Sequence, residues 1–491
     1  MGANLDKKLQ AYYTNSDFIT DYMINNLDLE NKDTILEPSV GEGIFVDKIL
    51  SANKNVYIDA YDIDDYAIRV VKQKYSNKEN IKIYESDTLF DERLDLLSDT
   101  HTGYTKIIGN PPYGAYLNMD VRKNLQIKYS GIYTKDTYVL FFYRCLNLLK
   151  PNGKMVFIIP DTFLYLNMHK KFRKYLFGNF CVEEIAIFPS KLFPGVSFAY
   201  SNLSIITVRN DETKILENNI CVYDDITNET QFNDIIENRM KPKFIAQKSI
   251  LDNPNYNLYL NKSTENLIRQ TKITLGNLAD CVTGIYTGNN KGFIKVLDER
   301  IRNSKGYQVI SNEEINLNWK SIEGIETSRC YVPLVKGSIK TPYKNIKYEW
   351  FINWSKEAIW HYNNDKRARF QNSSYYFRTG IAVPMLKSKK VKAAIINGKV
   401  FDQSIVGVFP KDNSNIYFLL ALLNSNIVNK IIHNINPTVN NSANYLKRIP
   451  IPNYSLNEFN KISELAYNLV HYKEENNDIL DFMINELYFR K

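Results

Sequence analysis

The chain has 491 residues, which is too long for one ordinary hydrophobic core, so we expect two or three domains. Its five cysteines lie far apart with no Cys-x-x-Cys pair, which argues against structural zinc and against a disulfide framework. The formal net charge is +8, and no apolar stretch suits a signal peptide or a membrane span, so we expect a soluble, cytoplasmic protein with no membrane partner.

The first patterned segment is a short apolar strand that ends at Glu37-Pro38. Gly41 and Gly43 then form a tight turn, and an amphipathic segment begins at Ile44. Glycines allow a ligand to approach the backbone closely and supply positive φ at low cost. The third glycine of a dinucleotide-binding fingerprint is missing, and Glu37 would repel a phosphate but attract an ammonium group. The turn therefore favours a ligand with a cationic group over a pyrophosphate.

The next two strands also lead into acidic residues, Asp62-Ile63 and then Asp87-Thr88. Asp62 lies about twenty residues past the glycine turn, the spacing at which an acid reaches ribose hydroxyls in α/β folds. Ile63 can cover one face of an adenine, and Asp87 can accept a hydrogen bond from an adenine amino group. Each acid alone is often a surface or capping residue, but in series they indicate a pocket for adenosine with a cationic tail.

Residues 107–113 read Ile-Ile-Gly-Asn-Pro-Pro-Tyr, so the tetrapeptide Asn110-Pro111-Pro112-Tyr113 follows a buried strand, where open α/β sheets bind their ligands. Two prolines remove two backbone donors and stiffen the loop. A planar amino group can donate to the Asn110 side-chain oxygen and the Pro111 carbonyl while its ring stacks on Tyr113. The loop favours chemistry on an exocyclic nucleobase amine, with an ordinary strand-ending turn as the alternative.

Charge and pattern change along the chain. Residues 1–240 hold 27 basic and 33 acidic side chains and residues 241–491 hold 35 and 21, so the two parts carry −6 and +14. From residue 273 the pattern becomes short strands separated by turns. We expect a catalytic domain over residues 1–240 and a second domain over residues 241–491, whose positive charge suits phosphate binding.

Which residues of the second domain would contact a nucleic acid is open. The densest basic runs are residues 366–370 and 387–392, which suit either phosphate contacts or a solvated helix face. Residues 436–442 are rich in asparagine and suit either adenine reading or plain turns. Residues 464–487 carry apolar side chains at helical spacing, which predicts a packing helix.

Taken in order, these motifs resemble those of a known family. Residues 1–210 are similar to the class I S-adenosylmethionine-dependent DNA amino-methyltransferases, in the motif order of the gamma class, typified by the Taq-type adenine methyltransferase. The resemblance implies an α/β catalytic domain with a doubly wound, mostly parallel seven-stranded sheet. It also implies a mixed α+β target-recognition domain with C-terminal helices, S-adenosylmethionine as the cofactor, and double-stranded DNA as the partner.

The same resemblance implies roles for individual residues. Thr14, followed by Asn15 where the family often has proline, would contact the methionine carboxylate of the cofactor. Phe193, in a Phe-Pro-Gly-Val motif, would flank the extruded base, with Phe188 as a rival. No metal is implied. The implied cofactor-binding residues are Thr14, Glu37, Pro38, Gly41, Gly43, Asp62, Ile63, Asp87, Thr88 and Asn110, and the implied catalytic residues are Asn110, Pro111, Pro112, Tyr113 and Phe193.

The reaction implied is base flipping followed by direct methyl transfer to the N6 amino group of adenine. Unstacking costs a few kcal/mol, and stacking on aromatic rings offsets about 1–3 kcal/mol per base. Three alternatives stay open: N4-cytosine methylation, amino-methylation of RNA or protein glutamine, and a DNA-binding subunit with a non-catalytic first domain. We expect a monomer in a restriction-modification or related system, with a separate restriction endonuclease as a candidate partner.

Overall fold

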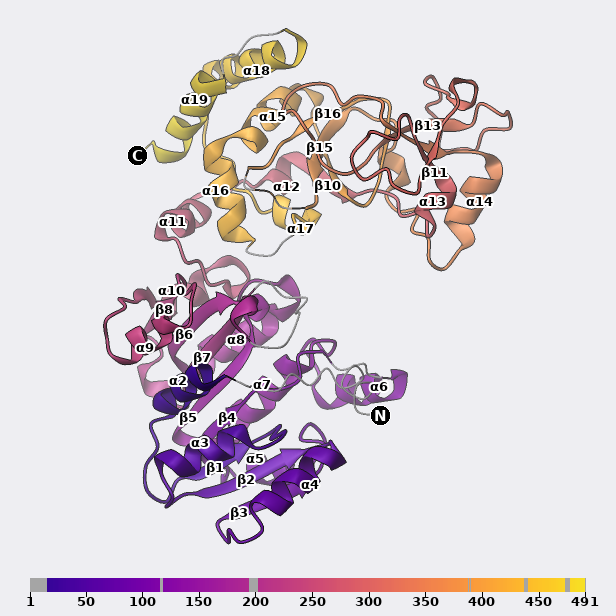
Figure 1. Ribbon diagram of the computed structural model, residues 1–491. Helices are drawn as coiled ribbons and strands as arrows, with labels where there is room; N and C mark the ends of the chain where they lie inside the picture. The colour runs from indigo at the N-terminus through magenta and orange to yellow at the C-terminus, as the bar shows by residue number, and fades with distance from the viewer. Residues whose placement is uncertain are drawn as a thin grey trace. The chain divides into compact units, whose positions relative to one another are not determined.

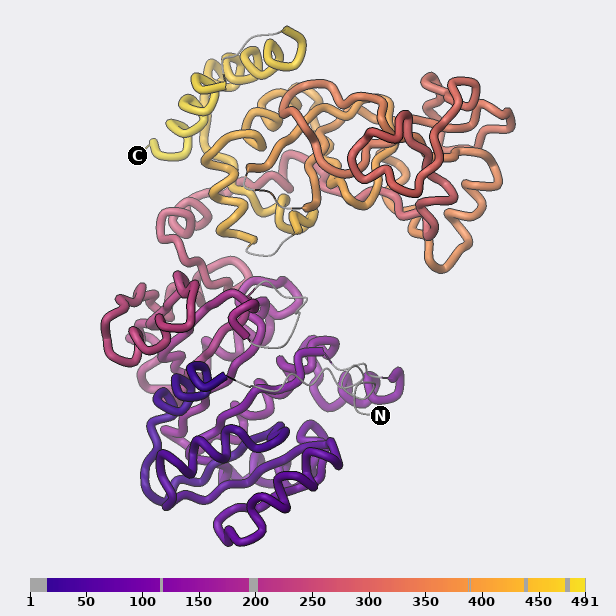
Figure 2. Tube along the Cα trace, viewed as in Figure 1, coloured from indigo at the N-terminus to yellow at the C-terminus, as the bar shows by residue number. Residues whose placement is uncertain are grey.

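The computed structural model describes residues 16–114, 118–193, 202–386, 388, 390–436, 440–472 and 477–490. The chain divides into two compact units, Met1–Leu260 (unit 1) and Asn261–Lys491 (unit 2) (Figure 1). The chain path through each unit can be followed in Figure 2.

Unit 1 is built on one mixed sheet. Its strands are β1 (Thr34–Glu37), β2 (Tyr57–Asp62), β3 (Ile81–Glu85), β4 (Tyr104–Gly109), β5 (Leu149–Pro160), β6 (Cys181–Pro189), β7 (Asn202–Arg209), β8 (Asn219–Tyr223) and β9 (Lys243–Ala246). The strand order is β3-β2-β1-β4-β5-β7-β6-β8-β9. Neighbours from β3 to β5 are parallel, and β7 runs antiparallel to both β5 and β6.

The sheet is larger than the seven strands that the sequence predicts. β8 pairs parallel to the edge of β6, and β9 pairs antiparallel to β8, so the described part of unit 1 holds a nine-stranded sheet. The segment after residue 210 therefore adds two strands to this edge of the sheet.

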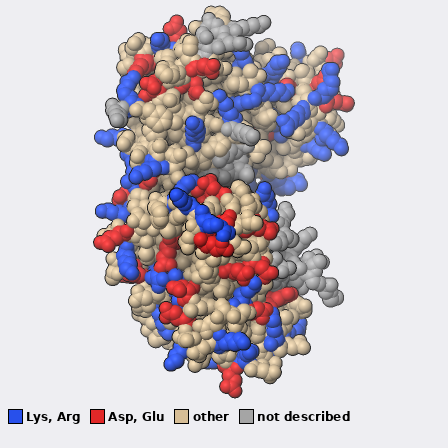
Figure 3. All heavy atoms as spheres, turned by 60° about the vertical axis from the view of Figure 1, so that its left-hand side comes forward, with Lys and Arg blue, Asp and Glu red and all other residues tan. Residues whose placement is uncertain are grey.

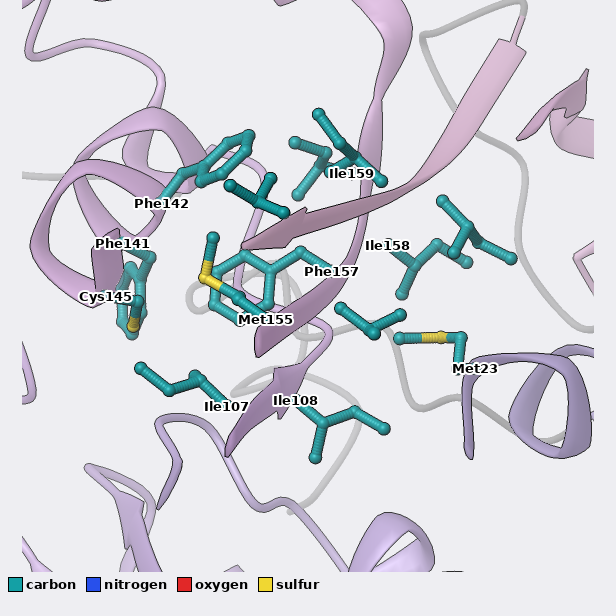
Figure 4. Packing of buried hydrophobic residues seen from close by; sticks show 14 of the residues in the cluster. Met23, Ile107, Ile108, Phe141, Phe142, Cys145, Met155, Phe157, Ile158 and Ile159 are labelled. Atoms are coloured by element: carbon teal, nitrogen blue, oxygen red, sulfur yellow. The ribbon is translucent and has the colours of Figure 1, made fainter. Parts of the chain in front are cut away.

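Helices cover both faces of this sheet. They are α2 (Asp17–Leu27), α3 (Ile44–Ala52), α4 (Asp65–Lys74), α5 (Glu92–Asp99), α6 (Met119–Lys128), α7 (Thr137–Asn147), α8 (Lys170–Asn179), α9 (Thr230–Ile236) and α10 (Gln247–Asp252). Figure 4 shows Cys145 of α7 on the side of Ile107, and Met23 of α2 on the side of Ile108 and Ile158. Successive side chains of a strand thus point to opposite faces of the sheet. Both faces are buried, as expected of central parallel strands.

The boundary between the units lies after Leu260 and not after residue 240. Gln247 is fully buried and donates to the backbone carbonyls of Phe177 and Phe180. The buried guanidinium of Arg173 donates to the Asn255 carbonyl, with an Nη2–O distance of 2.9 Å. Because buried polar groups need such partners, the segment up to residue 260 belongs to unit 1.

Unit 2 contains two small sheets. Its strands are β10 (Ala279–Thr283), β11 (Ile294–Val296), β12 (Gln308–Val309), β13 (Tyr331–Val335), β14 (Trp350–Asn353), β15 (Gly380–Pro384), β16 (Ala394–Ile396), β17 (Val400–Phe401) and β18 (Ile405–Pro410). One sheet has the order β10-β18-β15-β16 and the other the order β12-β11-β14-β13-β17. A shared apolar cluster with Trp354 at its centre packs residues of both sheets together.

The helices of unit 2 are α11 (Lys262–Gln270), α12 (Leu275–Leu278), α13 (Asn290–Phe293), α14 (Lys356–Asn364), α15 (Ile416–Asn424), α16 (Asn426–Ile435), α17 (Ala443–Leu446), α18 (Leu456–His471) and α19 (Asn477–Phe489). The single packing helix predicted over residues 464–487 is wrong, because α18 ends at His471 and α19 is separate. Ile479 and Phe482, which we expected to be packed, are exposed. Within the described residues no single helix is long and apolar enough to cross a membrane. One bent pair of helices, Asn413–Asn424 and Asn426–Ile435, has the length and composition of a membrane span, and only these two properties point to one.

Candidate active site

Hydrogen bonds join the loops that follow the central strands of unit 1. The Thr88 hydroxyl, after β3, donates to the Pro38 carbonyl, after β1, with an oxygen–oxygen distance of 2.6 Å. The Ser39 hydroxyl donates to the backbone carbonyl of Asn110, after β4, at 3.2 Å. The structure therefore brings the predicted glycine turn, the second acidic segment and the Asn-Pro-Pro-Tyr loop to one edge of the sheet.

The glycine turn is held against the end of β2. Gly41 and Gly43 have φ of 51° and 83°, in the region that favours glycine. The Gly41 amide donates to Asp62 Oδ2 at 2.8 Å, and the Asp64 amide donates to Asp62 Oδ1 at 2.9 Å. The Tyr75 hydroxyl donates to the Gly43 carbonyl at 2.9 Å. Asp62 thus shapes the turn and keeps lone pairs on both oxygens for a ligand.

Replacing Gly43 should destabilise unit 1. A Cβ at this position would lie 2.9 Å from Tyr75 Oη, on a backbone with positive φ. We expect Gly43→Ala to cost about 1–3 kcal/mol of stability, measured by thermal or urea unfolding. Gly178→Ala is the matched control, because a Cβ there meets nothing within 4 Å; equal effects of the two changes would contradict the expectation.

Glu37 is the most unusual residue at this edge. It is 1 % exposed, and neither of its side-chain oxygens has a hydrogen-bond partner within the described residues. Burial, followed by the nearby Asp62 and Asp47, raises the pKa of Glu37 well above its usual value. A buried carboxylate without partners is costly, so this position suits a cationic group supplied by a ligand.

The two acids predicted to bind adenosine lie beside it. Burial raises the pKa of Asp62, although three backbone amides oppose the shift. Burial likewise raises the pKa of Asp87, which accepts from the Leu89 amide at 2.9 Å. Ile63 is 57 % exposed, so it offers an apolar surface next to Asp62. These environments fit a ligand that has hydroxyl and amino donors and a planar apolar ring.

The Asn-Pro-Pro-Tyr loop is fixed from two sides. The Thr137 hydroxyl, at the start of α7, donates to the Pro112 carbonyl at 2.6 Å. The Tyr113 hydroxyl donates to the Ile158 carbonyl of β5 at 3.4 Å. A Cβ at Gly109 would lie 3.2 Å from Pro38 Cδ, so the loop starts in close contact with the glycine-turn strand. This rigidity suits a site that must hold an amine in one orientation.

The aromatic residues proposed to stack on a base are buried. Tyr113 and Phe193 are each 1 % exposed, so stacking on either ring requires these side chains to open toward the ligand. The Tyr113 ring lies edge-on to Tyr138, with a centroid distance of 6.3 Å. The rival Phe188 is equally buried and packs edge-on against Phe232 at 5.2 Å within the same core, so burial does not distinguish the two candidates.

Residues 42–193 match the model of the Eco57I restriction-modification methylase. This part of the chain is similar to the Eco57I restriction-modification methylase family. The match includes Gly43, Asp62, Asp87, Asn110 and Phe193, so it spans most of the edge described above.

Named relatives agree with this family. The chain is 28 % identical over 305 residues to Type II methyltransferase M.AccI of Acinetobacter calcoaceticus, covering 58 % of this chain and 53 % of that protein. It is 23 % identical over 376 residues to adenine-specific methyltransferase PglX of Lacticaseibacillus casei, covering 71 % of this chain and 29 % of PglX. The matched stretches thus span about half or less of these relatives' length.

The fold is shared with a solved restriction-modification enzyme. A nuclease-deletion mutant of the Type ISP enzyme LlaGI, solved in complex with a DNA substrate mimic, aligns with a TM-score of 0.57. The alignment covers 96 % of this chain and 56 % of that chain at 14 % identity. At this identity the likeness shows the fold alone.

Two features that the sequence predicts for the site lie outside the described residues, namely Thr14 and the Pro-Gly-Val that follows Phe193. Sequence reasoning also missed Asp161, a buried acid directly after β5. The signal was present, because an acid directly after an apolar strand is the same pattern that singled out Asp62 and Asp87.

Proposed function

We propose that the chain is a site-specific DNA methyltransferase that transfers the methyl group of S-adenosylmethionine to the N6 amino group of a flipped-out adenine. The observation that carries the proposal is Glu37, a buried carboxylate without a hydrogen-bond partner in the described residues, on the strand next to β4, which leads into Asn110. A cofactor with an ammonium group would pair with Glu37. If it also carries an electrophilic methyl group, it would supply the methyl group for an amine held by Asn110.

The residues of the edge fit this cofactor. Glu37 would hold its ammonium group, Asp62 its ribose hydroxyls, Ile63 one face of its adenine and Asp87 the adenine amino group. When bound, it supplies the methyl group that is transferred. Gly41 and Gly43 allow the backbone to approach it closely.

The Asn-Pro-Pro-Tyr loop would act on the target amine. The Asn110 side-chain oxygen and the Pro111 carbonyl accept its two hydrogens, which frees the nitrogen lone pair from delocalisation into the ring. They also stabilise the positive charge that develops on nitrogen. The nitrogen–carbon bond forms as the carbon–sulfur bond breaks and its electron pair goes to sulfur, and one proton leaves the nitrogen. Tyr113 and Phe193 would stack on the extruded base.

Unit 2 would grip the DNA. Figure 3 shows Lys and Arg side chains together with Asp and Glu over both units, so what favours unit 2 is the excess of basic over acidic residues, 35 against 21 over residues 241–491. The basic run at residues 366–370 is paired with the turn after β10, because the Arg369 amide donates to the Tyr286 carbonyl at 2.7 Å and the Tyr286 amide donates in return at 3.2 Å. A basic segment fixed beside a polar turn suits phosphate contacts. Asn436 and Asn441, by contrast, are buried, which favours the turn interpretation for that segment.

Sequencing of DNA from a methylation-deficient bacterial host tests the proposal. We expect expression of the chain to place N6-methyladenine at one recurring sequence, because one relative is named as adenine-specific and the loop begins with asparagine. A detection method that separates N6-methyladenine from N4-methylcytosine is required. Modified cytosine would overturn the assignment of the base, and unmodified DNA beside methylated RNA or protein would overturn DNA as the substrate.

A further inference from the structure

Asp161 has no part in the mechanism above, yet it lies at the same edge of the sheet. It begins the 3-10 turn η1 (Asp161–Leu164) directly after β5, the neighbour of β4. It is 5 % exposed, and its Oδ2 accepts a hydrogen bond from Asn202 Nδ2 at 3.2 Å. Burial raises the pKa of Asp161 to about 7, against the lowering effect of Asn202 and of a backbone amide.

On one side, Asp161 is linked to the segment that carries Phe193. Asn202 is the first residue of β7 and pairs with Pro189, the last residue of β6. Pro189 leads directly into the turn η3 (Ser190–Leu192), and the Phe193 amide donates to the Ser190 carbonyl at 3.0 Å. A side-chain anchor on Asn202 therefore fixes the point from which Phe193 projects.

On the other side, the same turn is linked to Tyr113. Thr162 Oγ1 and Tyr138 Oη are hydrogen-bonded at 2.9 Å. The Tyr138 ring lies edge-on to the Tyr113 ring, at an interplanar angle of 85°. The η1 turn is thus hydrogen-bonded to Asn202, which is linked to the segment of Phe193, and to Tyr138, which packs against Tyr113. Phe193 and Tyr113 are the two rings that the proposed function assigns to the extruded base.

We propose that Asp161 is a positioning residue that sets the placement of Phe193 relative to Tyr113 through its hydrogen bond with Asn202. Its role in base stacking rests on the proposed function, whereas the linkage itself does not. An ionised carboxylate accepts a stronger hydrogen bond than a neutral carboxyl group, so the anchor tightens as Asp161 loses its proton. The nearest titratable neighbour is Tyr165, whose pKa is raised by burial and then by Asp161, so Tyr165 stays protonated near neutral pH; Asp224 is the next acid beyond it.

A reporter at Phe193 tests the linkage without any methylation. We expect the tryptophan in Phe193→Trp, measured as the difference from the parent protein, to change its emission between pH 5.5 and 8.5 with a midpoint near 7. Asp161→Asn in the same background should abolish the change, and Asn202→Ala should abolish it while the carboxylate remains. A transition that survives both changes, or no transition in the parent reporter, would overturn the proposal.

The pH profile of methyl transfer tests the consequence. With tritiated S-adenosylmethionine and unmethylated lambda phage DNA, we expect kcat/KM of the wild-type chain to rise several-fold from pH 6 to pH 8, and that of Asp161→Asn to stay flat. Asp211→Asn is the matched control, because this buried acid lies past the opposite end of β7 and bonds locally to Thr213. Identical profiles for wild type and Asp161→Asn would overturn the role in catalysis. A wild-type chain that transfers no methyl group would refute the proposed function, while the reporter would still decide the linkage.

Discussion

Asn110→Ala should lower the rate of methyl transfer by at least about 10²–10³-fold, the usual effect of removing one preorganised group that stabilises developing charge. The remaining Pro111 carbonyl cannot hold both amine hydrogens, so the nitrogen lone pair stays delocalised. Because the change removes only a side chain after β4, the glycine turn and the two acidic strand ends should bind S-adenosylmethionine nearly as before. Single-turnover kinetics and calorimetry separate the two effects.

A second asparagine provides the control for this experiment. Asn80 donates through Nδ2 to the Val56 carbonyl at 2.7 Å and lies just before β3, at the opposite edge of the sheet. Asn80→Ala should cost about 1 kcal/mol of stability and leave the transfer rate unchanged. If Asn110→Ala retains wild-type turnover, or loses activity only in proportion to cofactor affinity, the side chain has no role in the chemical step.

The grouping of the site could be predicted from sequence because parallel strands place their carboxyl ends at one edge. Glu37, Asp62 and Asp87 each follow or end an apolar strand, and the structure joins their loops by backbone and side-chain hydrogen bonds. Asp161 obeys the same rule. Local pattern was therefore sufficient to find acids at this edge, even where their neighbours were unknown.

What local pattern could not supply was the choice of distant partners. The short strand β8 pairs with β6, and β9 pairs with β8. The alternation of apolar and polar residues in β8 and β9 does not indicate which strand they pair with. The burial of Tyr113 and Phe193 likewise depends on contacts with β5 and the core. In α19, helical spacing marked Ile479 and Phe482 as packed, but the spacing does not tell which of two apolar faces meets a neighbour.

Glu37→Gln should change cofactor affinity and the stability of the free protein in opposite directions. The variant loses a charge-assisted hydrogen bond to the ammonium group, worth about 1.5–3 kcal/mol, so S-adenosylmethionine should bind about 10–100-fold more weakly. The free protein should become more stable at neutral pH, because an amide of the same shape removes a buried ionisable group that has no partner in the described residues.

The pH dependence fixes the sign of this stability effect. Burial raises the folded-state pKa of Glu37 above its unfolded value, so the folded protein binds the proton more tightly than the unfolded chain does. The stability that this proton contributes is complete below the unfolded pKa. It is lost as pH rises toward the folded pKa. Wild type and Glu37→Gln should therefore unfold at similar temperatures near pH 4, with the variant gaining an increasing advantage as pH rises. Glu42→Gln, at an exposed position between the two turn glycines, should change neither quantity. Unchanged cofactor affinity in Glu37→Gln, or a variant less stable than wild type at neutral pH, would show that internal contacts and not a cationic ligand satisfy this carboxylate.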